Sequence, residues 1–188
     1  MTDPPTDTVG DGAPKRAAAG RVAVAQRHAR ATLRVAFAFV VATGIALVVP
    51  HHTGWWLPLH LFLAGALLLA ISAATQLFAV TWAAGPPGAS IVVVSQRWIL
   101  AASVALLTAA RELEWPSALA ALGGAGVIVA LLILAVSLRK TVRAGVQRRF
   151  DGPLNGYLCA LLAGAIGPTL GVAMVVGLSG STVARVRA

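Results

Sequence analysis

The chain has 188 residues, of which 58% are apolar and only 11% are charged. A water-soluble domain carries about 25% charged residues, so this composition excludes an ordinary soluble protein. The single cysteine excludes an intramolecular disulfide and a cysteine-rich metal site, and the net charge is +9. Because the cations lie mostly between apolar runs, we expect the lipid bilayer, and not nucleic acid, as their partner.

Residues 1–34 are expected to form a disordered and basic cytoplasmic tail. Residues 1–14 hold three aspartates and three prolines and have almost nothing to bury, which is typical of disorder. Residues 15–34 carry six Lys and Arg residues among alanines and valines. This stretch allows a helix that lies at the headgroup surface and runs into the next segment. A signal peptide is the rival interpretation, but the basic region is long and more apolar runs follow.

Five apolar runs follow, and a helix needs about 20 such residues to cross a hydrocarbon core. Pro50, the pair Pro86-Pro87 and Pro116 separate the first four runs. The predicted fold is an all-α integral membrane protein, a bundle of five transmembrane helices over residues 35–49, 57–82, 91–110, 118–138 and 154–178. Residues 179–188 form a short C-terminal tail.

The distribution of Lys and Arg predicts the topology. With the N-terminus in the cytoplasm, five spans place twelve of the fifteen Lys and Arg residues inside. Arg111, Arg185 and Arg187 fall outside. This agrees with the positive-inside bias, so we expect a multi-pass protein of the plasma (inner) membrane with its C-terminus outside.

The uncharged run at residues 55–82 contains one ionisable residue, His60, between tryptophans at its two ends. At about 100° per residue, several small or polar side chains share the half of the helix that holds His60: Ala64, Gly65, Ser72, Thr75 and Gln76. His60 is therefore expected to face the bundle. A neutral imidazole there can bind haem iron or copper. Alternatively, it bonds a neighbouring helix or reaches the headgroups.

His51 and His52 lie in the loop that precedes this run. With His60 they place three imidazoles on one side of the membrane, so a copper or zinc site is a hypothesis for all three residues. Adjacent histidines do not easily bind one ion, and a loop with solvated histidines is the alternative. All six carboxylates lie in loops or the tail. This pattern favours a non-enzymatic protein with no catalytic residues.

The last run carries small residues at Ala160, Gly164, Gly167 and Gly171. Such a smooth stripe lets another helix approach closely. The alternative is room for a flat ligand, such as a porphyrin, beside this face.

Two stretches carry a family resemblance: PLHLFLAGALLLAISAATQLFAVTWAAGPP at residues 58–87 and YLCALLAGAIGPTLGVAM at residues 157–174. They resemble the multi-span membrane region that precedes copper nitrite reductase or multicopper-oxidase-like domains in actinobacterial proteins. That group is distantly similar to haem–copper oxidase subunit one. The resemblance implies that His60 holds the place of a haem-binding histidine. A further histidine-bearing span follows in those relatives, so we expect a shortened or split member, or a partner chain that supplies the missing part.

The leading hypothesis is a haem- or copper-associated membrane subunit related to respiratory or nitrogen-oxide proteins. It would act with a membrane partner chain or as a homo-oligomer. A small permease or channel is the second hypothesis, since Ser, Thr and Gln side chains occur in three of the spans. A structural partner, or a fragment of a longer membrane protein, is the third.

Overall fold

The structure, a computed structural model, describes residues 12–145 and 151–175. These residues form α1 (Gly12–Val48), α2 (Trp56–His60), the π-helix η1 (Leu61–Leu67), α3 (Leu68–Trp82), α4 (Ser90–Glu112), α5 (Ser117–Arg143) and α6 (Asp151–Val175). Of the tails predicted at residues 1–34 and 179–188, residues 1–11 and 179–188 lie outside the described residues.

Helices α2, η1 and α3 follow one another without a break, so they form a single rod over Trp56–Trp82. Five described helices are long and apolar enough to cross a membrane: Ala18–Val48, Trp56–Trp82, Ser90–Glu112, Ser117–Arg143 and Asn155–Met174. The prediction of an all-α fold with five such helices is confirmed. The basic stretch at residues 15–34 lies in the same helix as the first apolar run, because alanine-rich sequence without proline favours continuous helix.

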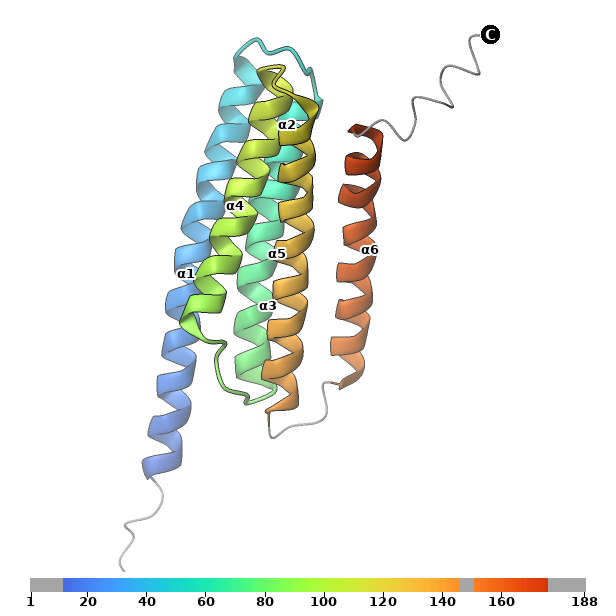
Figure 1. Ribbon diagram of the computed structural model, residues 1–188. Helices are drawn as coiled ribbons and strands as arrows, with labels where there is room; N and C mark the ends of the chain where they lie inside the picture. The colour runs from blue at the N-terminus through green and yellow to red at the C-terminus, as the bar shows by residue number, and fades with distance from the viewer. Residues whose placement is uncertain (1–11, 146–150, 176–188) are drawn as a thin grey trace, which may run out of the picture.

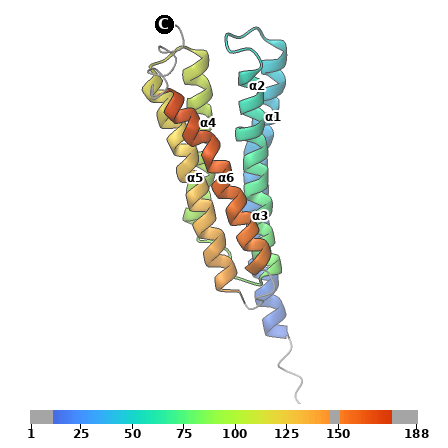
Figure 2. The same cartoon turned by 90° about the vertical axis from the view of Figure 1, so that its right-hand side faces the viewer.

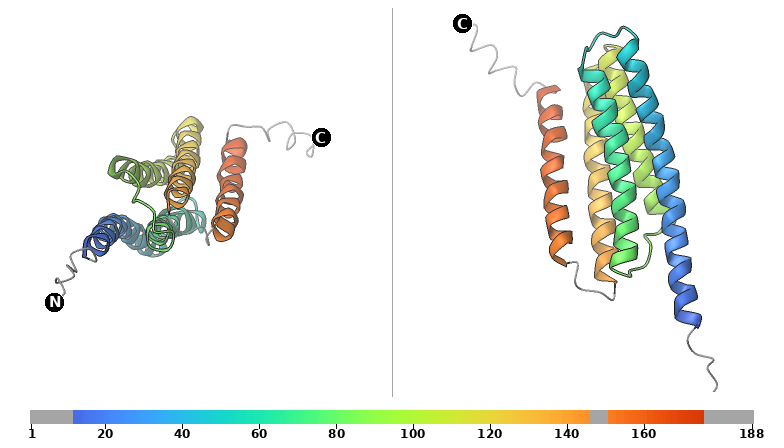
Figure 3. Two further views of the ribbon diagram at one scale, coloured as in Figure 1. Left: turned by 90° about the horizontal axis from the view of Figure 1, so that it is seen from below. Right: turned by 180° about the vertical axis from the view of Figure 1, so that it is seen from behind.

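The helices run alternately up and down, as Figure 1 shows. Seen from below in Figure 3, α1 and α3 lie side by side, α4 pairs with α5, and α6 stands at the edge. The lower end of Figure 1 carries the start of α1, the 83–89 loop and the end of α5. Ten of the Lys and Arg residues in the described ranges lie toward it, so we call it the basic end. The opposite end holds the 49–55 loop, His60 and the end of α4.

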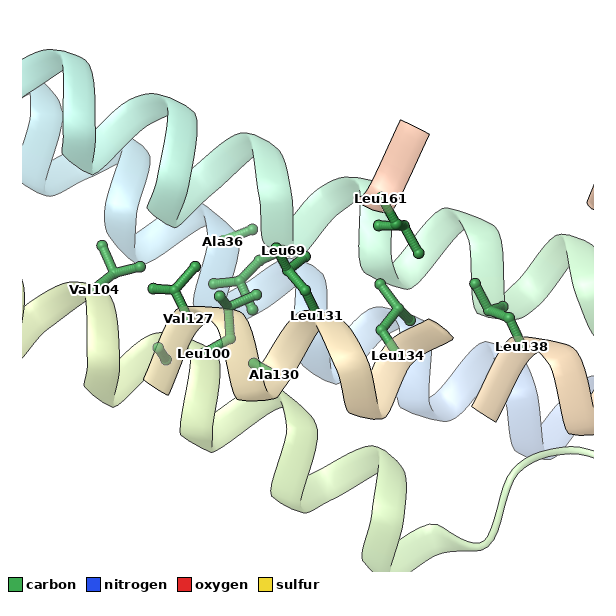
Figure 4. Packing of buried hydrophobic residues seen from close by; sticks show 11 residues of the cluster. Ala36, Leu69, Leu100, Val104, Val127, Ala130, Leu131, Leu134, Leu138 and Leu161 are labelled. Atoms are coloured by element: carbon green, nitrogen blue, oxygen red, sulfur yellow. The ribbon is translucent and has the colours of Figure 1, made fainter. Parts of the chain in front are cut away.

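The core lies midway along the bundle, where leucines of three helices meet (Figure 4). Leu69, Leu100 and Leu134 are almost completely buried. Helix α6 adds Leu161, the one buried side chain among its described residues. The edge helix is therefore held to the bundle by little apolar contact.

Helices α4 and α5 cross closely at Gly123. A Cβ atom at this position would lie 2.7 Å from the Leu107 amide nitrogen and 2.8 Å from the Ser103 carbonyl oxygen. These neighbours are backbone atoms of α4, so they cannot turn away as a side chain does. The missing side chain at Gly123 thus sets the distance between the two helices.

We expect Gly123→Ala to lower the free energy of unfolding by about 1–3 kcal/mol, because the added methyl group must push α4 and α5 apart. Thermal unfolding in detergent would measure the change. Gly44→Ala in α1 is the matched control, since its Cβ atom meets nothing within 4 Å. The control should be neutral, or more stable by up to about 1 kcal/mol, because alanine favours helix. Equal stability of the two variants would contradict the close crossing.

Candidate functional site

His60 is the last residue of α2, and its ring is fixed by two contacts with Trp56. Its Nδ1 lies 2.8 Å from the Trp56 carbonyl oxygen. A carbonyl only accepts, so Nδ1 carries the proton and donates, and in the neutral ring Nε2 keeps a free lone pair. The Trp56 ring stacks on the imidazole, with ring centroids 3.9 Å apart and planes 23° apart. These two contacts fix the tautomer and the orientation of the His60 imidazole.

The π-helix η1 begins directly after His60. Such widened turns are rare and occur frequently at functional sites. Gly65 lies within η1, and a Cβ atom there would be 2.6 Å from Cγ of Phe39, so the α1 ring packs against the bare backbone. Because π turns hold more residues than α turns, the uniform 100° spacing used for the prediction does not apply across this segment.

A groove of about 410 Å³ runs beside His60, between the Trp56–Trp82 rod and helices α5 and α6. Its lining is apolar except for His60 and Tyr157. Figure 2 shows α6 crossing this face and diverging from α2 toward the His60 end. His60 is half-buried and lines the groove instead of pointing into the packed centre of the bundle.

The small residues of α6 divide between the groove and the outside. Ala160 and Gly164 line the groove together with Pro168, whereas Gly167 and Gly171 lie outside its lining, and all four small residues are exposed. The Tyr157 hydroxyl donates to Thr75 Oγ1 at 3.3 Å and so joins α6 to α3. The stripe predicted from the sequence therefore borders an open space over part of its length.

His51 lies in the 49–55 loop, and both of its ring nitrogens meet backbone carbonyls. Nδ1 lies 2.8 Å from the Val49 oxygen and Nε2 2.6 Å from the Gly54 oxygen. Since both carbonyls are acceptors, the two contacts favour the protonated ring, in which neither nitrogen has a lone pair for a metal. These bonds, first that to Val49 and then that to Gly54, raise the pKa of His51.

The same loop is tied to α4 through Glu112. The His52 amide donates to Glu112 Oε1 at 2.7 Å, and the Thr53 hydroxyl donates to Oε2 at 2.8 Å.

Within residues 12–145 and 151–175, no three His, Cys, Asp or Glu side chains come together as a metal site. The structure thus gives His51 a role in loop geometry, and a metal role for His52 or His60 stays a prediction.

A buried polar cluster joins α3 to α4 at mid-bundle. The Ser72 hydroxyl donates to Gln96 Oε1 at 3.1 Å, and Gln76 Nε2 donates to Ser72 Oγ at 3.1 Å. Sequence reasoning singled out Ser72 and Gln76 but missed Gln96. The signal was available, because a glutamine within an apolar run needs a hydrogen-bonding partner.

Comparisons of the chain with protein-family models, with curated proteins and with solved structures found no match. The resemblance to the membrane region of copper nitrite reductase-like proteins therefore stays a prediction from the sequence.

We expect the 49–55 loop to lose stability as the pH rises through the raised pKa of His51. The two-carbonyl clamp is complete below the ordinary histidine pKa near 6.5, and one bond is lost on deprotonation. Melting temperatures of wild type and His51→Ala between about pH 5 and pH 9 measure this. The variant should be less stable at acidic pH, and the difference should vanish at alkaline pH. His52→Ala, whose ring makes no described hydrogen bond, should show no such pH dependence. A constant difference across the range would contradict the clamp.

Proposed function

We propose that this chain is an integral membrane protein that binds haem in the groove beside His60 and acts as a non-enzymatic subunit. The single observation that carries the haem proposal is the 2.8 Å hydrogen bond from His60 Nδ1 to the Trp56 carbonyl oxygen. It leaves the Nε2 lone pair available to a metal such as haem iron. Proteins commonly fix the tautomer of a metal-binding histidine through a hydrogen bond from the other ring nitrogen.

Two features support insertion into a membrane. Large apolar side chains are exposed along the described helices, among them Phe37, Ile45, Leu162 and Ile166. In water such a surface would be an unusually large apolar patch, whereas in lipid it needs no cover. Ten of the eleven Lys and Arg residues in the described ranges lie toward the basic end. Under the positive-inside rule this end is cytoplasmic, which puts His60 near the outer face of the membrane.

The groove suits a haem better than a bare metal ion. Copper or zinc takes three or four ligands, whereas the groove lining offers only His60 and Tyr157, whose hydroxyl already bonds Thr75. A porphyrin brings four nitrogen ligands of its own, so one imidazole is sufficient to hold it. The groove volume of about 410 Å³ falls within the roughly 300–1,000 Å³ typical of ligand pockets.

Residues around His60 would position such a ligand. His60 would bind the iron through Nε2, while the Trp56 carbonyl and ring hold the imidazole in place. Ala160 and Gly164 keep the opposite wall flat. Arg111, whose Cζ lies 5.8 Å from the Trp56 ring centroid, places a cation at this end for acidic substituents. When bound, a haem would supply a redox-active iron, and a partner chain or a second copy would supply any further protein ligand.

We expect His60→Ala to lower the haem-to-protein ratio about tenfold or more, because the only ligating nitrogen of the groove is removed. The porphyrin absorption band of protein purified in detergent from haem-replete cells measures this. His52→Ala is the matched control and should keep the band. Added imidazole should restore the band in His60→Ala, which separates loss of the ligand from loss of the fold. A colourless wild-type protein, or equal bands in both variants, would overturn the proposal.

Gly164→Leu should weaken haem binding about tenfold, because the new side chain projects from α6 into the groove. Gly167→Leu is the control three residues along the same helix, outside the groove lining. At both positions a Cβ atom meets nothing within 4 Å, so the helix itself tolerates either change. Haem titration of the two variants, followed by absorbance, makes the comparison. Equal affinities would show that haem binds elsewhere.

A further inference from the structure

Arg97 is a cation enclosed in the bundle without a partner. It lies in the second turn of α4, and its side chain is only 8% exposed. Its Nε and Nη1 atoms are buried and make no hydrogen bond in the described residues. A buried guanidinium without acceptors is costly, so an acceptor of opposite charge is expected at this position.

The ionisable side chains described around Arg97 are basic. On α1, His28 lies within electrostatic range of both Arg97 and Arg27. Its Nε2 is 3.2 Å from Ser90 Oγ. On α5, which packs against α4, the charged side chains at this end are Arg139, Lys140 and Arg143. The polar side chain that α3 contributes near here is the neutral Gln76.

The acids of α4 and the loop after it are too far away to neutralise this cluster. Glu112 lies fifteen residues from Arg97, which is about 22 Å along a helix, and Glu114 lies beyond it. Glu112 at the end of α4 and Glu114 just after it therefore do not lie beside Arg97.

We propose that Arg97 binds the phosphate of an anionic phospholipid at the basic end of the bundle. A guanidinium presents planar, paired donors that match phosphate oxygens. Arg97 lies seven residues from the start of α4, about 10 Å from the helix end, and helical side chains lean toward the N-terminus. Its long side chain therefore reaches toward the headgroup level.

The surroundings favour a lipid over a free phosphate ion. The Arg97 Cζ atom lies 5.6 Å from the centroid of the Trp98 ring, which is 55% exposed on the outer face of α4. Ile91 and Val92 are also exposed nearby on the same helix. An acyl chain attached to the phosphate would lie against this apolar surface, which offers a free ion nothing.

The test uses the full chain in neutral detergent and measures bound lipid by native mass spectrometry and by the melting temperature. The probes are phosphatidylglycerol, phosphatidylcholine and inorganic phosphate. Wild type should retain phosphatidylglycerol and gain thermal stability from it, and the other two probes should have little effect. Arg97→Gln should lose about tenfold in phosphatidylglycerol affinity, because charge-assisted hydrogen bonds are removed. Arg97→Lys keeps the charge but loses the planar donors, so its affinity for phosphatidylglycerol should lie between those of wild type and Arg97→Gln.

Arg143→Gln replaces an exposed arginine at the same end of the bundle and is the matched control, so it should bind phosphatidylglycerol as wild type does. Equal lipid retention by Arg97→Gln and Arg143→Gln would overturn the proposal. Equal stabilisation by inorganic phosphate would identify a free ion instead. A change of oligomeric state in Arg97→Gln without loss of lipid would identify the carboxylate of another chain. The proposal rests on membrane insertion but not on haem, so the haem band of Arg97→Gln should be unchanged.

Discussion

In a hydrocarbon environment, which we propose for this chain, each backbone N–H and C=O group must find its hydrogen-bond partner inside the chain. The non-helical stretches between described helices, at residues 49–55, 83–89 and 113–116, all lie at the ends of the bundle. Within the Trp56–Trp82 rod, η1 departs from α-geometry and still closes its hydrogen bonds within the helix. Side chains then decide how the rods pack, as Gly123 does for α4 and α5.

The five long helices were predictable because the sequence patterns that indicate them are local. Long apolar runs and the breaks at Pro50, Pro86 and Pro116 locate five helices without knowledge of their neighbours. The π-helix was not predictable, because the apolar run that contains it carries no local signal for a widened turn, and its contact with Phe39 joins distant parts of the sequence. The edge position of α6 depends likewise on which partners bury its side chains, and only Leu161 among its described residues is buried.

The candidate site was predictable in part. The isolated position of His60 in an uncharged run singled it out, but its bond to the Trp56 carbonyl is a property of the folded turn. From the sequence, His51 was a candidate metal ligand, whereas in the structure both of its ring nitrogens lie within hydrogen-bond distance of backbone carbonyl oxygens. Arg97 appeared from sequence as an ordinary cation near a helix start. Its enclosure follows from the way α1 and α4 pack, which no local pattern reveals.

The groove between α6 and the Trp56–Trp82 rod lies at the outer edge of the bundle, where hydrocarbon and not water is the proposed surrounding medium. A solute that enters it comes from solution in the lipid phase. Its occupancy is then governed by its mole fraction in the bilayer, and a strongly apolar solute is concentrated there before it meets the protein. Dissociation constants expressed per volume of buffer would consequently change with the amount of lipid or detergent, even though the protein's own preference is constant.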